Sequence, residues 1–167
     1  MNFSFTEEQQ EFRLILRRFL EDKSPTTEVR RLMETDEGCD PDVWRQVCQD
    51  LGLTGVHIPE EYGGLSLPIS AGAAILEEIH RSGGNAAACH AQMYTMGTVL
   101  RHGSEEQKRM LLPGISSGEL RLQAFGVTEP TSGTDTSRIR TTATREGDTY
   151  RINGQKVWTS RIAHSDF

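Results

Sequence analysis

The stretch with the clearest chemical potential lies between residues 124 and 138, where small polar residues follow an apolar segment. It contains Val127-Thr128-Glu129-Pro130, followed by Ser132-Gly133-Thr134-Asp135. A strand end followed by such residues can turn several backbone N–H groups and hydroxyls toward one ligand. Pro130 favours an extended Glu129, and Gly133 lets the backbone approach a flat or anionic group closely. The stretch therefore predicts either a binding loop for such a group or a plain connection between elements.

The residues before this stretch repeat with helical spacing. Two capping boxes, Thr6 with Gln9 and Ser104 with Gln107, mark helix starts. Pro113 is expected to bend or end the last helix of the series. The expected helices cover residues 6–22, 28–34, 40–51, 68–83, 85–103 and 104–112.

From residue 121 onward the pattern has a period of two, which is typical of strands. The sequence thus predicts an α+β chain, with an all-α helical domain over residues 1–120 and the first strands of a β-domain over residues 121–167. Because the last residues, Ser165-Asp166-Phe167, interrupt an element, we expect the chain to be a fragment of a longer protein. The three or four expected strands lie at 121–127, 139–144, 150–152 and 156–158, with a turn at 146–148 and a tight hairpin turn at Asn153-Gly154.

Charge and composition argue against several classes of function. The 167 residues carry a net charge of −6 with the acids spread along the chain, which argues against a nucleic-acid surface. No apolar run approaches the ~20 residues of a membrane span, and the acidic N-terminus argues against a transit peptide. The three cysteines have neither an even count nor CxxC spacing, so we expect reduced thiols and no metal site. These features predict a soluble cytoplasmic protein, or one of the mitochondrial matrix if this is a eukaryotic mature form.

Two features admit both a structural and a functional interpretation. His57 stands between apolar neighbours, where a histidine bonded to the backbone is favoured over a catalytic one. The helix over residues 85–103 has a small, soft apolar face that includes Met93 and Met96. Core packing is the default interpretation of such a face, and the wall of a pocket for a flexible apolar chain is the alternative.

Five stretches together resemble one family in order and spacing, the flavin-dependent acyl-CoA dehydrogenases. The resemblance covers essentially the whole chain, and its strength lies in the correct order of the pieces. The most informative of them are Val127-Thr128-Glu129-Pro130 with Gly133-Thr134-Asp135, and Ile152-Asn153-Gly154-Gln155-Lys156-Val157-Trp158. The other matching stretches are residues 5–9, 51–64 and 103–108.

The resemblance implies a three-part fold with an N-terminal helical domain, a middle β-barrel-like domain and a C-terminal helical bundle. This chain looks like the first part with the opening strands of the second. The resemblance also implies FAD as cofactor, an acyl-CoA thioester as substrate, electron-transfer flavoprotein as acceptor and a homotetramer at full length. By position, the flavin contacts are Phe125, Val127, Thr128, Trp158 and Ser160. The positions beside the thioester and its pantetheine arm are Ser132 and Thr134, with Met93 and Met96 on the side of the acyl chain.

The implied reaction removes the proton alpha to the thioester with a carboxylate and passes a hydride from the beta carbon to flavin N5. The family's base is a glutamate of the C-terminal bundle, so we expect it beyond Phe167 and expect the isolated fragment to be inactive. Glu129 is a carboxylate in the right region, but a structural role in the turn is favoured for it. Arg138 departs from the family pattern, which usually has a small residue at that position.

Two alternatives to a dehydrogenase stay open. One is an acyl-CoA oxidase or flavin monooxygenase relative, in which the reduced flavin reacts with oxygen. The other is a non-catalytic subunit that pairs with a second subunit supplying the base.

Overall fold

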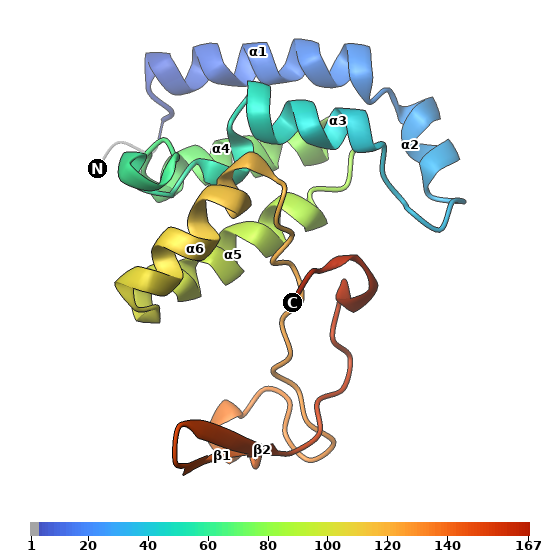
Figure 1. Cartoon of the computed structure of the whole chain (residues 1–167). Helices are drawn as coiled ribbons and strands as arrows, with labels where there is room; N and C mark the ends of the chain where they lie inside the picture. The colour runs from blue at the N-terminus through green and yellow to red at the C-terminus, as the bar shows by residue number, and fades with distance from the viewer. Residues whose placement is uncertain (1–3) are drawn as a thin grey trace.

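A computed structural model describes residues 4–167 of the chain. Within these residues, six α-helices come first and one two-stranded antiparallel sheet follows. The helices pack as one bundle, and the sheet lies apart from them at the end of two extended segments (Figure 1). The expected α+β organisation, with helices first and opening strands second, is therefore confirmed. The helices are α1 (Glu7–Lys23), α2 (Thr26–Leu32), α3 (Pro41–Arg45), α4 (Ile69–Arg81), α5 (Ala87–His102) and α6 (Glu105–Ser117), and the strands are β1 (Thr142–Glu146) and β2 (Thr149–Asn153).

Local sequence signals start two of the helices where they were expected. In α1 the Thr6 hydroxyl accepts a hydrogen bond from the backbone N–H of Gln9, and the Gln9 side chain accepts one from the backbone N–H of Thr6. Ser104 and Gln107 form the same reciprocal pair at the start of α6. These capping boxes satisfy backbone donors that have no partner within the helix.

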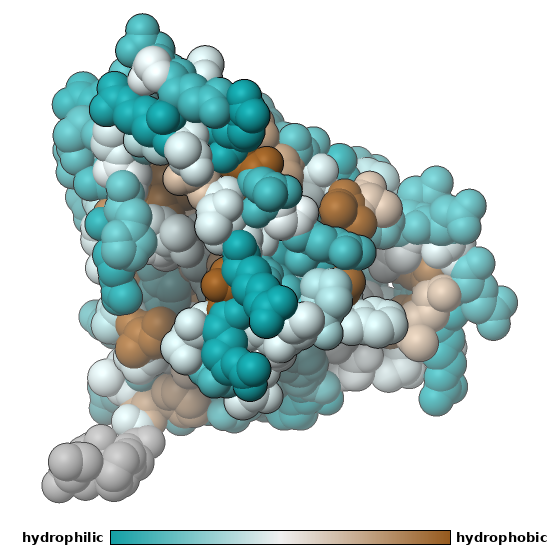
Figure 2. All heavy atoms as spheres, turned by 90° about the horizontal axis from the view of Figure 1, so that it is seen from below, coloured by the Kyte–Doolittle hydropathy of each residue, from teal (hydrophilic) through white to brown (hydrophobic). Residues whose placement is uncertain are grey.

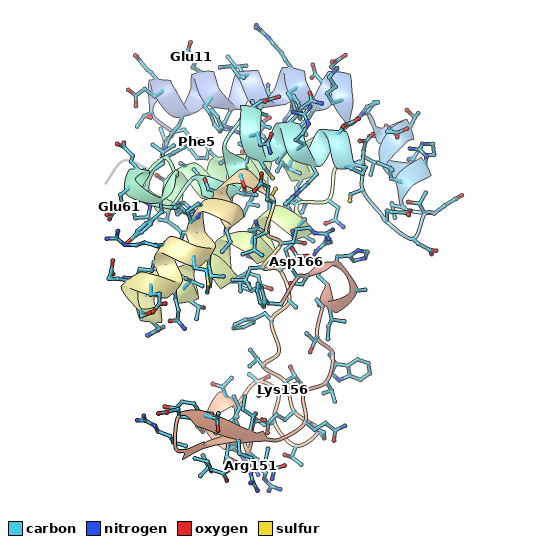
Figure 3. All side chains as sticks on the ribbon, in the orientation of Figure 1. Phe5, Glu11, Glu61, Arg151, Lys156 and Asp166 are labelled. Carbon is cyan, nitrogen blue, oxygen red and sulfur yellow. The ribbon has the colours of Figure 1, made fainter. Side chains whose placement is uncertain are left out.

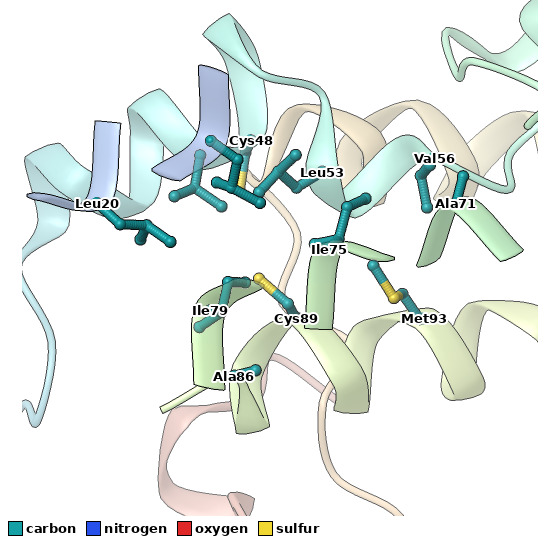
Figure 4. Packing of buried hydrophobic residues seen from close by; sticks show 12 residues of the cluster. Leu20, Cys48, Leu53, Val56, Ala71, Ile75, Ile79, Ala86, Cys89 and Met93 are labelled. Carbon is teal, nitrogen blue, oxygen red and sulfur yellow. The ribbon is translucent and has the colours of Figure 1, made fainter. Parts of the chain in front are cut away.

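Two clusters of buried apolar side chains hold the bundle together. The larger cluster contains Leu16, Leu53 and Ile75, all fully buried (Figure 4). The smaller cluster contains Met96 and Leu112, which are also fully buried. Burial of a side chain of this size contributes about 1.5–3 kcal/mol. Because both clusters include residues of α5, this helix has a fixed place in the bundle.

A buried carboxylate joins α1 to α4. Glu78 is 1% exposed and accepts hydrogen bonds from Arg13, Arg17 and Arg81 at N–O distances of 2.8 to 3.2 Å. The bonds from Arg17, Arg81 and Arg13 lower the pKa of Glu78 to about 2, against the desolvation that opposes its charge. The two helices are therefore held by charge as well as by packing.

Two of the expected helices differ from the structure. The helix expected over residues 40–51 is α-helical only in α3 and continues as a π-helical turn over Gln46–Asp50. The other, α6, runs to Ser117, so the helix does not end near Pro113 as expected. Leu112 and Ile115 on either side of the proline are fully buried. Burial of two such side chains offsets the ~3 kcal/mol that a proline costs inside a helix.

His57 and the cysteines have structural environments. His57 Nδ1 lies 3.0 Å from Leu67 O, which agrees with the structural interpretation of this histidine. Cys39, Cys48 and Cys89 are free thiols, and the last two are buried in the larger cluster. Burial raises the pKa of Cys48 to about 11 and that of Cys89 to about 12, so both act as small apolar core residues.

Of the two turns that the sequence predicted, the one at residues 146–148 forms the hairpin. Strand β1 pairs with β2 in a register that sets Glu146 opposite Thr149, so the turn is Gly147-Asp148. Gly147 has a φ of +63°, the left-handed conformation that a two-residue hairpin turn needs. The turn expected at Asn153-Gly154 was wrong. Gly154 instead allows a close approach, because a Cβ there would lie 2.2 Å from Thr141 Oγ1.

The strands expected over residues 121–127 and 156–158 do not form a ladder in the described chain; both segments are extended connections. Val157 N donates to Thr128 O at 2.9 Å. Val127 O accepts a hydrogen bond from the Lys156 side chain at 3.1 Å. Among the described residues, no second backbone hydrogen bond joins residues 121–128 to residues 156–158, so the pairing does not extend into a ladder.

Among residues 4–167, none of the helices has the length and apolarity that crossing a membrane requires. On the face seen in Figure 2, apolar residues form separate small patches among hydrophilic ones. Scattered apolar residues of this kind are ordinary on a folded surface.

Candidate functional site

Two segments connect the bundle with the hairpin and carry every residue predicted as a cofactor contact; both are largely extended, and the second includes a short 3-10 helix at Ile162–His164. We call residues 121–128 the descending arm and residues 156–166 the ascending arm. Both run between bundle and hairpin in Figure 1, and Figure 3 shows Lys156 toward the hairpin end and Asp166 at the bundle end. Phe125, Val127 and Thr128 lie on the descending arm, and Trp158 and Ser160 lie on the ascending arm.

At the hairpin end, the buried carboxylate of Glu129 ties the arms together. It accepts hydrogen bonds from Thr141 Oγ1 at 2.5 Å, Arg140 N at 2.7 Å, Lys156 Nζ at 2.9 Å and Thr141 N at 3.0 Å. These donors, led by the Thr141 hydroxyl, lower the pKa of Glu129 to about 2. Lys156 Nζ also donates to Val127 O. A carboxylate engaged in this way stays ionised and has its lone pairs occupied, which favours the structural role of Glu129 over that of a base.

At the bundle end, the arms meet again through Arg121 and Asp166. Asp166 N donates to Arg121 O at 2.8 Å, and Arg121 N donates to Asp166 Oδ2 at 2.6 Å. Ser165 Oγ donates to Arg121 O and accepts from the backbone N–H groups of Gln123 and Ala124 at 2.9 and 3.0 Å. The arms are therefore joined at both ends, and the predicted flavin contacts lie along the parts between.

The predicted flavin contacts present rings and hydroxyls. Trp158 is 88% exposed and Phe125 is 47% exposed. Trp158 has a φ of +60°, which a bulky residue adopts only when its surroundings hold it there. The hydroxyls of Thr128 and Ser160 have no hydrogen-bond partner among residues 4–167, so both are free to bind a ligand. Exposed aromatic faces beside free hydroxyls suit a flat heteroaromatic ring.

The two residues predicted beside the thioester lie in the loop after Glu129. Ser132 is buried and its Oγ donates to Asp135 O at 2.6 Å, so its hydroxyl stabilises the loop. Thr134 is exposed, and its hydroxyl has no partner within the described residues. Arg138, which departs from the family pattern, is exposed at the end of the short helical turn that follows. Of the two predicted contacts, Thr134 is the one open to a ligand.

Met93 and Met96 lie on the core side of α5. Met96 is fully buried in the smaller cluster, and Met93 belongs to the larger one (Figure 4). This arrangement agrees with the core-packing interpretation of the soft apolar face. Contact of either methionine with an acyl chain stays a prediction, and it requires the side chain to reach the surface of the helix.

The side of α5 that faces the descending arm carries His90 and Tyr94 instead. The Tyr94 ring centroid lies 5.2 Å from that of Phe125 and 5.2 Å from that of His90, and both contacts are edge-to-face. Neither residue was predicted as part of the site. Their spacing of four was a signal that they share one helix face, but the sequence did not indicate that Phe125 packs against this face.

Two domain profiles match the chain in order. The profile of the acyl-CoA dehydrogenase N-terminal domain matches residues 6–119, and that of the acyl-CoA dehydrogenase middle domain matches residues 124–167. The chain belongs to the acyl-CoA dehydrogenase family. The resemblance inferred from the five sequence stretches is thereby confirmed. The ascending arm and residues 124–128 of the descending arm lie within the residues that match the family's middle domain.

Known members of the acyl-CoA dehydrogenase family match over nearly the whole chain. Acyl-CoA dehydrogenase FadE26 of Mycobacterium tuberculosis is 34% identical over 176 residues, covering 100% of this chain and 42% of that relative. An acyl-CoA dehydrogenase from Geobacillus kaustophilus has a TM-score of 0.84 at 30% identity, covering 99% and 43%. A chain of the ChsE4–ChsE5 complex from Mycobacterium tuberculosis has a TM-score of 0.81 at 33% identity, covering 99% and 42%. The chain thus spans less than half the length of these family members.

A further family structure concerns the cofactor. An acyl-CoA dehydrogenase from Bacillus anthracis was solved in complex with FAD, and it has a TM-score of 0.76 and 29% identity to this chain. The match covers 98% of this chain and 28% of that protein. A relative with the same fold over these residues therefore binds FAD.

Proposed function

We propose that the chain is the N-terminal part of an FAD-dependent acyl-CoA dehydrogenase, which introduces a double bond between the alpha and beta carbons of an acyl-CoA thioester. The observation that carries this proposal is the exposed Trp158 ring on its left-handed backbone, two residues before the free hydroxyl of Ser160. Phe125 and Thr128 supply a second ring and a second free hydroxyl from the other arm. Membership of the acyl-CoA dehydrogenase family supports the same assignment.

The residues of the two arms fit a flavin. The rings of Trp158 and Phe125 offer faces against which a flat ring system packs. When bound, FAD supplies the acceptor for the hydride, which is chemistry that the protein orients rather than performs. The hydroxyls of Thr128 and Ser160 donate hydrogen bonds without adding charge, so they stabilise negative charge that develops next to them. Val127, the residue before Thr128, is held by the hydrogen bond that Lys156 Nζ donates to its carbonyl.

The substrate is proposed to lie between the arms and α5. The free hydroxyl of Thr134 is a donor for the pantetheine arm, and Ser132 keeps the loop that carries it in shape. His90 and Tyr94 line the face of α5 next to Phe125, so the acyl side of the site has an aromatic surface there. Contact of the acyl chain with Met93 or Met96 stays a separate prediction beside this aromatic lining.

Glu129 is not proposed as the base. General-base catalysis alpha to a thioester needs a carboxylate that is free to take a proton, and the Glu129 carboxylate is occupied by hydrogen-bond donors from Arg140, Thr141 and Lys156. We therefore assign the base to the remainder of the whole protein.

Anaerobic titration of the whole protein tests the reaction. The purified protein is mixed with a series of acyl-CoA thioesters while its visible absorption is recorded. Bleaching of the flavin band by one class of thioester supports the dehydrogenase and identifies its substrate class. A flavin that stays oxidised with every thioester contradicts the reaction but not the cofactor, and a protein without any flavin band contradicts both.

Trp158→Ala tests whether the arms hold the cofactor. Loss of a packed aromatic face is expected to weaken FAD binding about tenfold. Tyr150→Ala is the matched control, because Tyr150 is another exposed aromatic residue but lies on β2, outside the arms. Flavin fluorescence gives both dissociation constants. Equal losses in the two variants would contradict the assignment of Trp158.

One comparison favours a second candidate, a subunit that pairs with another family member supplying the base. The ChsE4–ChsE5 structure is a complex of two named proteins, and this chain resembles one of its chains. Light scattering of the purified whole protein, alone and with co-expressed family members, separates this candidate from the expected homotetramer. A stable homotetramer that turns over thioesters by itself would contradict the pairing subunit.

The electron acceptor is proposed to be electron-transfer flavoprotein. Reduction of the enzyme by substrate, followed by exposure to air, separates this proposal from an acyl-CoA oxidase or flavin monooxygenase relative. Slow reoxidation by air and fast reoxidation by an electron-transfer flavoprotein support the dehydrogenase. Fast reoxidation by air alone supports the oxygen-reacting alternative.

A further inference from the structure

A chain of buried polar contacts links α5 to the ascending arm. Gln92 on α5 is fully buried, and its Nε2 donates to Ile115 O at 2.9 Å and to Leu120 O at 3.0 Å. Gln123 on the descending arm is 1% exposed, and its Nε2 donates to Gln92 Oε1 at 3.2 Å. Gln123 Oε1 in turn accepts from Arg161 Nε at 2.7 Å. The contacts therefore run from the end of α6 through α5 and the descending arm to the ascending arm.

Arg161, the last residue in this series of contacts, has an uncommon backbone conformation. Arg161 has a φ of +59°, in the left-handed region that disfavours residues with a Cβ. This left-handed residue comes directly after Ser160, so its conformation sets the path of the arm where the Ser160 hydroxyl is presented. The hydrogen bond from the Arg161 guanidinium to Gln123 is a contact that holds the arm in this conformation.

Filling space does not require two glutamines at this place. A buried amide costs free energy unless its donors and acceptors are partnered, whereas an apolar side chain of similar size fills the same volume without that condition. Within the described residues, every buried side-chain nitrogen and oxygen has a partner. Hydrogen bonds differ from apolar contacts in being directional, since they weaken steeply outside a narrow range of distance and angle. Gln92 and Gln123 therefore fix an orientation as well as a position.

We propose that Gln92, Gln123 and Arg161 form a positioning relay that fixes Ser160 relative to α5. The importance of this relay rests on the proposed function, in which Ser160 contacts the flavin and α5 lines the acyl side of the site. The relay keeps the Ser160 hydroxyl at a fixed position relative to α5. Binding of the flavin at Ser160 therefore affects the geometry of α5, and binding of the substrate at α5 affects that of Ser160. Its three members act through Ser160, and we assign none of them to the reacting atoms.

The first experiment needs no flavin. Hydrogen exchange of the FAD-free whole protein is compared between wild type and Arg161→Gly, which accepts the left-handed backbone without strain but lacks the guanidinium. The relay predicts exchange about tenfold faster at the hydrogen-bonded amides of His164 and Asp166, which donate to Arg161 O and Arg121 O, because their local opening becomes easier. Exchange in α1 and α4 is expected to stay unchanged. Wild-type exchange at His164 and Asp166 in the variant would overturn the relay.

The second experiment measures the cofactor. The relay predicts that Arg161→Gly and Gln123→Met each weaken FAD binding about tenfold and shift the visible absorption of the bound flavin. The double variant is expected to bind no more weakly than either single variant, because both remove the same contact. Arg161→Lys, which keeps a donor near Gln123, is expected to retain most of the affinity. Arg145→Met, which removes an exposed arginine of the hairpin, is the control and is expected to bind FAD as wild type does.

The outcomes separate the relay from the proposed function. A wild-type protein that binds no FAD contradicts the proposed function, and the exchange experiment then still decides on the relay. A wild-type protein that binds FAD, with unchanged affinity and spectrum in Arg161→Gly and Gln123→Met, overturns the relay alone. Losses that add fully in the double variant also overturn it, because they indicate two independent contacts. If Gln123→Met does not fold, the comparison of Arg161→Gly with Arg161→Lys decides.

Discussion

Lys156 Nζ lies 2.9 Å from Glu129 Oε1, and this ion pair joins the hairpin ends of the two arms. The same ammonium group holds Val127 O on the descending arm, while Lys156 itself lies two residues before Trp158 on the ascending arm. The geometry of the predicted flavin contacts therefore depends on an interaction in which no ligand takes part.

Lys156→Met removes this ammonium group but keeps most of the apolar stem. The two arms are then expected to separate at the hairpin end, and FAD binding to the whole protein is expected to weaken about tenfold. Arg151→Met is the control, because Arg151 pairs with Glu146 on the exposed hairpin, away from the arms. Flavin fluorescence measures both affinities. Equal affinity in Lys156→Met and wild type would refute the role of the ion pair.

The carboxylate that joins α1 to α4 predicts a pH dependence. The pKa of Glu78 is lowered from the ordinary 4.5 to about 2, so its charge stabilises the fold above pH 4.5 and this contribution is lost as the pH falls toward 2. Glu78→Gln is expected to lower the melting temperature at pH 7 and to reduce the fall in melting temperature between pH 5 and pH 3. Melting curves followed by circular dichroism measure both. Parallel pH profiles for wild type and variant would show that the charge of Glu78 does not stabilise the fold in this pH range.

The larger core cluster predicts a contrast between two leucines of α1. Leu16 is fully buried and Leu14 is 49% exposed. Leu16→Ala is expected to lower the free energy of unfolding of the helical part by about 2–5 kcal/mol, because it removes buried methyl groups and leaves a cavity. Leu14→Ala is expected to change it by no more than about 0.5 kcal/mol. Urea unfolding measures both, and similar values for the two variants would contradict the placement of α1 in the core.

Gly154 and Gly133, two glycines near the predicted site, are expected to differ in how well they tolerate substitution by alanine. A Cβ at Gly154 would lie 2.2 Å from Thr141 Oγ1, which donates to Glu129, whereas a Cβ at Gly133 meets nothing within 4 Å. Gly154→Ala is expected to displace Thr141 and lower both FAD affinity and the melting temperature of the whole protein. Gly133→Ala is expected to leave the melting temperature unchanged. A Gly154→Ala variant with wild-type affinity and melting temperature would be incompatible with this close approach.

The sequence predicted those features whose partners are near in the chain. Thr6 and Gln9 are three residues apart, so a capping box is visible without knowledge of the fold. The turn at residues 146–148 was predicted for the same reason, but the turn predicted at Asn153-Gly154 does not form. Both glycines stand in turn-like dipeptides, and only the contact of Gly154 with Thr141 distinguishes them.

The predicted site residues show the same limit. Three of the five predicted flavin contacts, Val127, Thr128 and Trp158, lie within the matching stretches, and these stretches reach both arms. Met93 and Met96 have the periodicity of either a core or a pocket wall, and their burial agrees with core packing, the default interpretation. That Tyr94 faces the arm follows from its contact with Phe125, a residue far along the chain. Distant contacts of this kind leave no pattern in a single sequence.

The hydrogen bonds between Arg121 and Asp166 have a topological consequence. They close residues 121–166 into a loop that leaves the helical bundle and returns to the same place on it. The entropy cost of closing a loop grows slowly with its length, by about 0.6 kcal/mol for each doubling. The far end of this loop can therefore be lengthened, shortened or exchanged at a small cost in the stability of the bundle. A scaffold of this kind lets the hairpin and its turn diverge among relatives while the two arms keep their spacing.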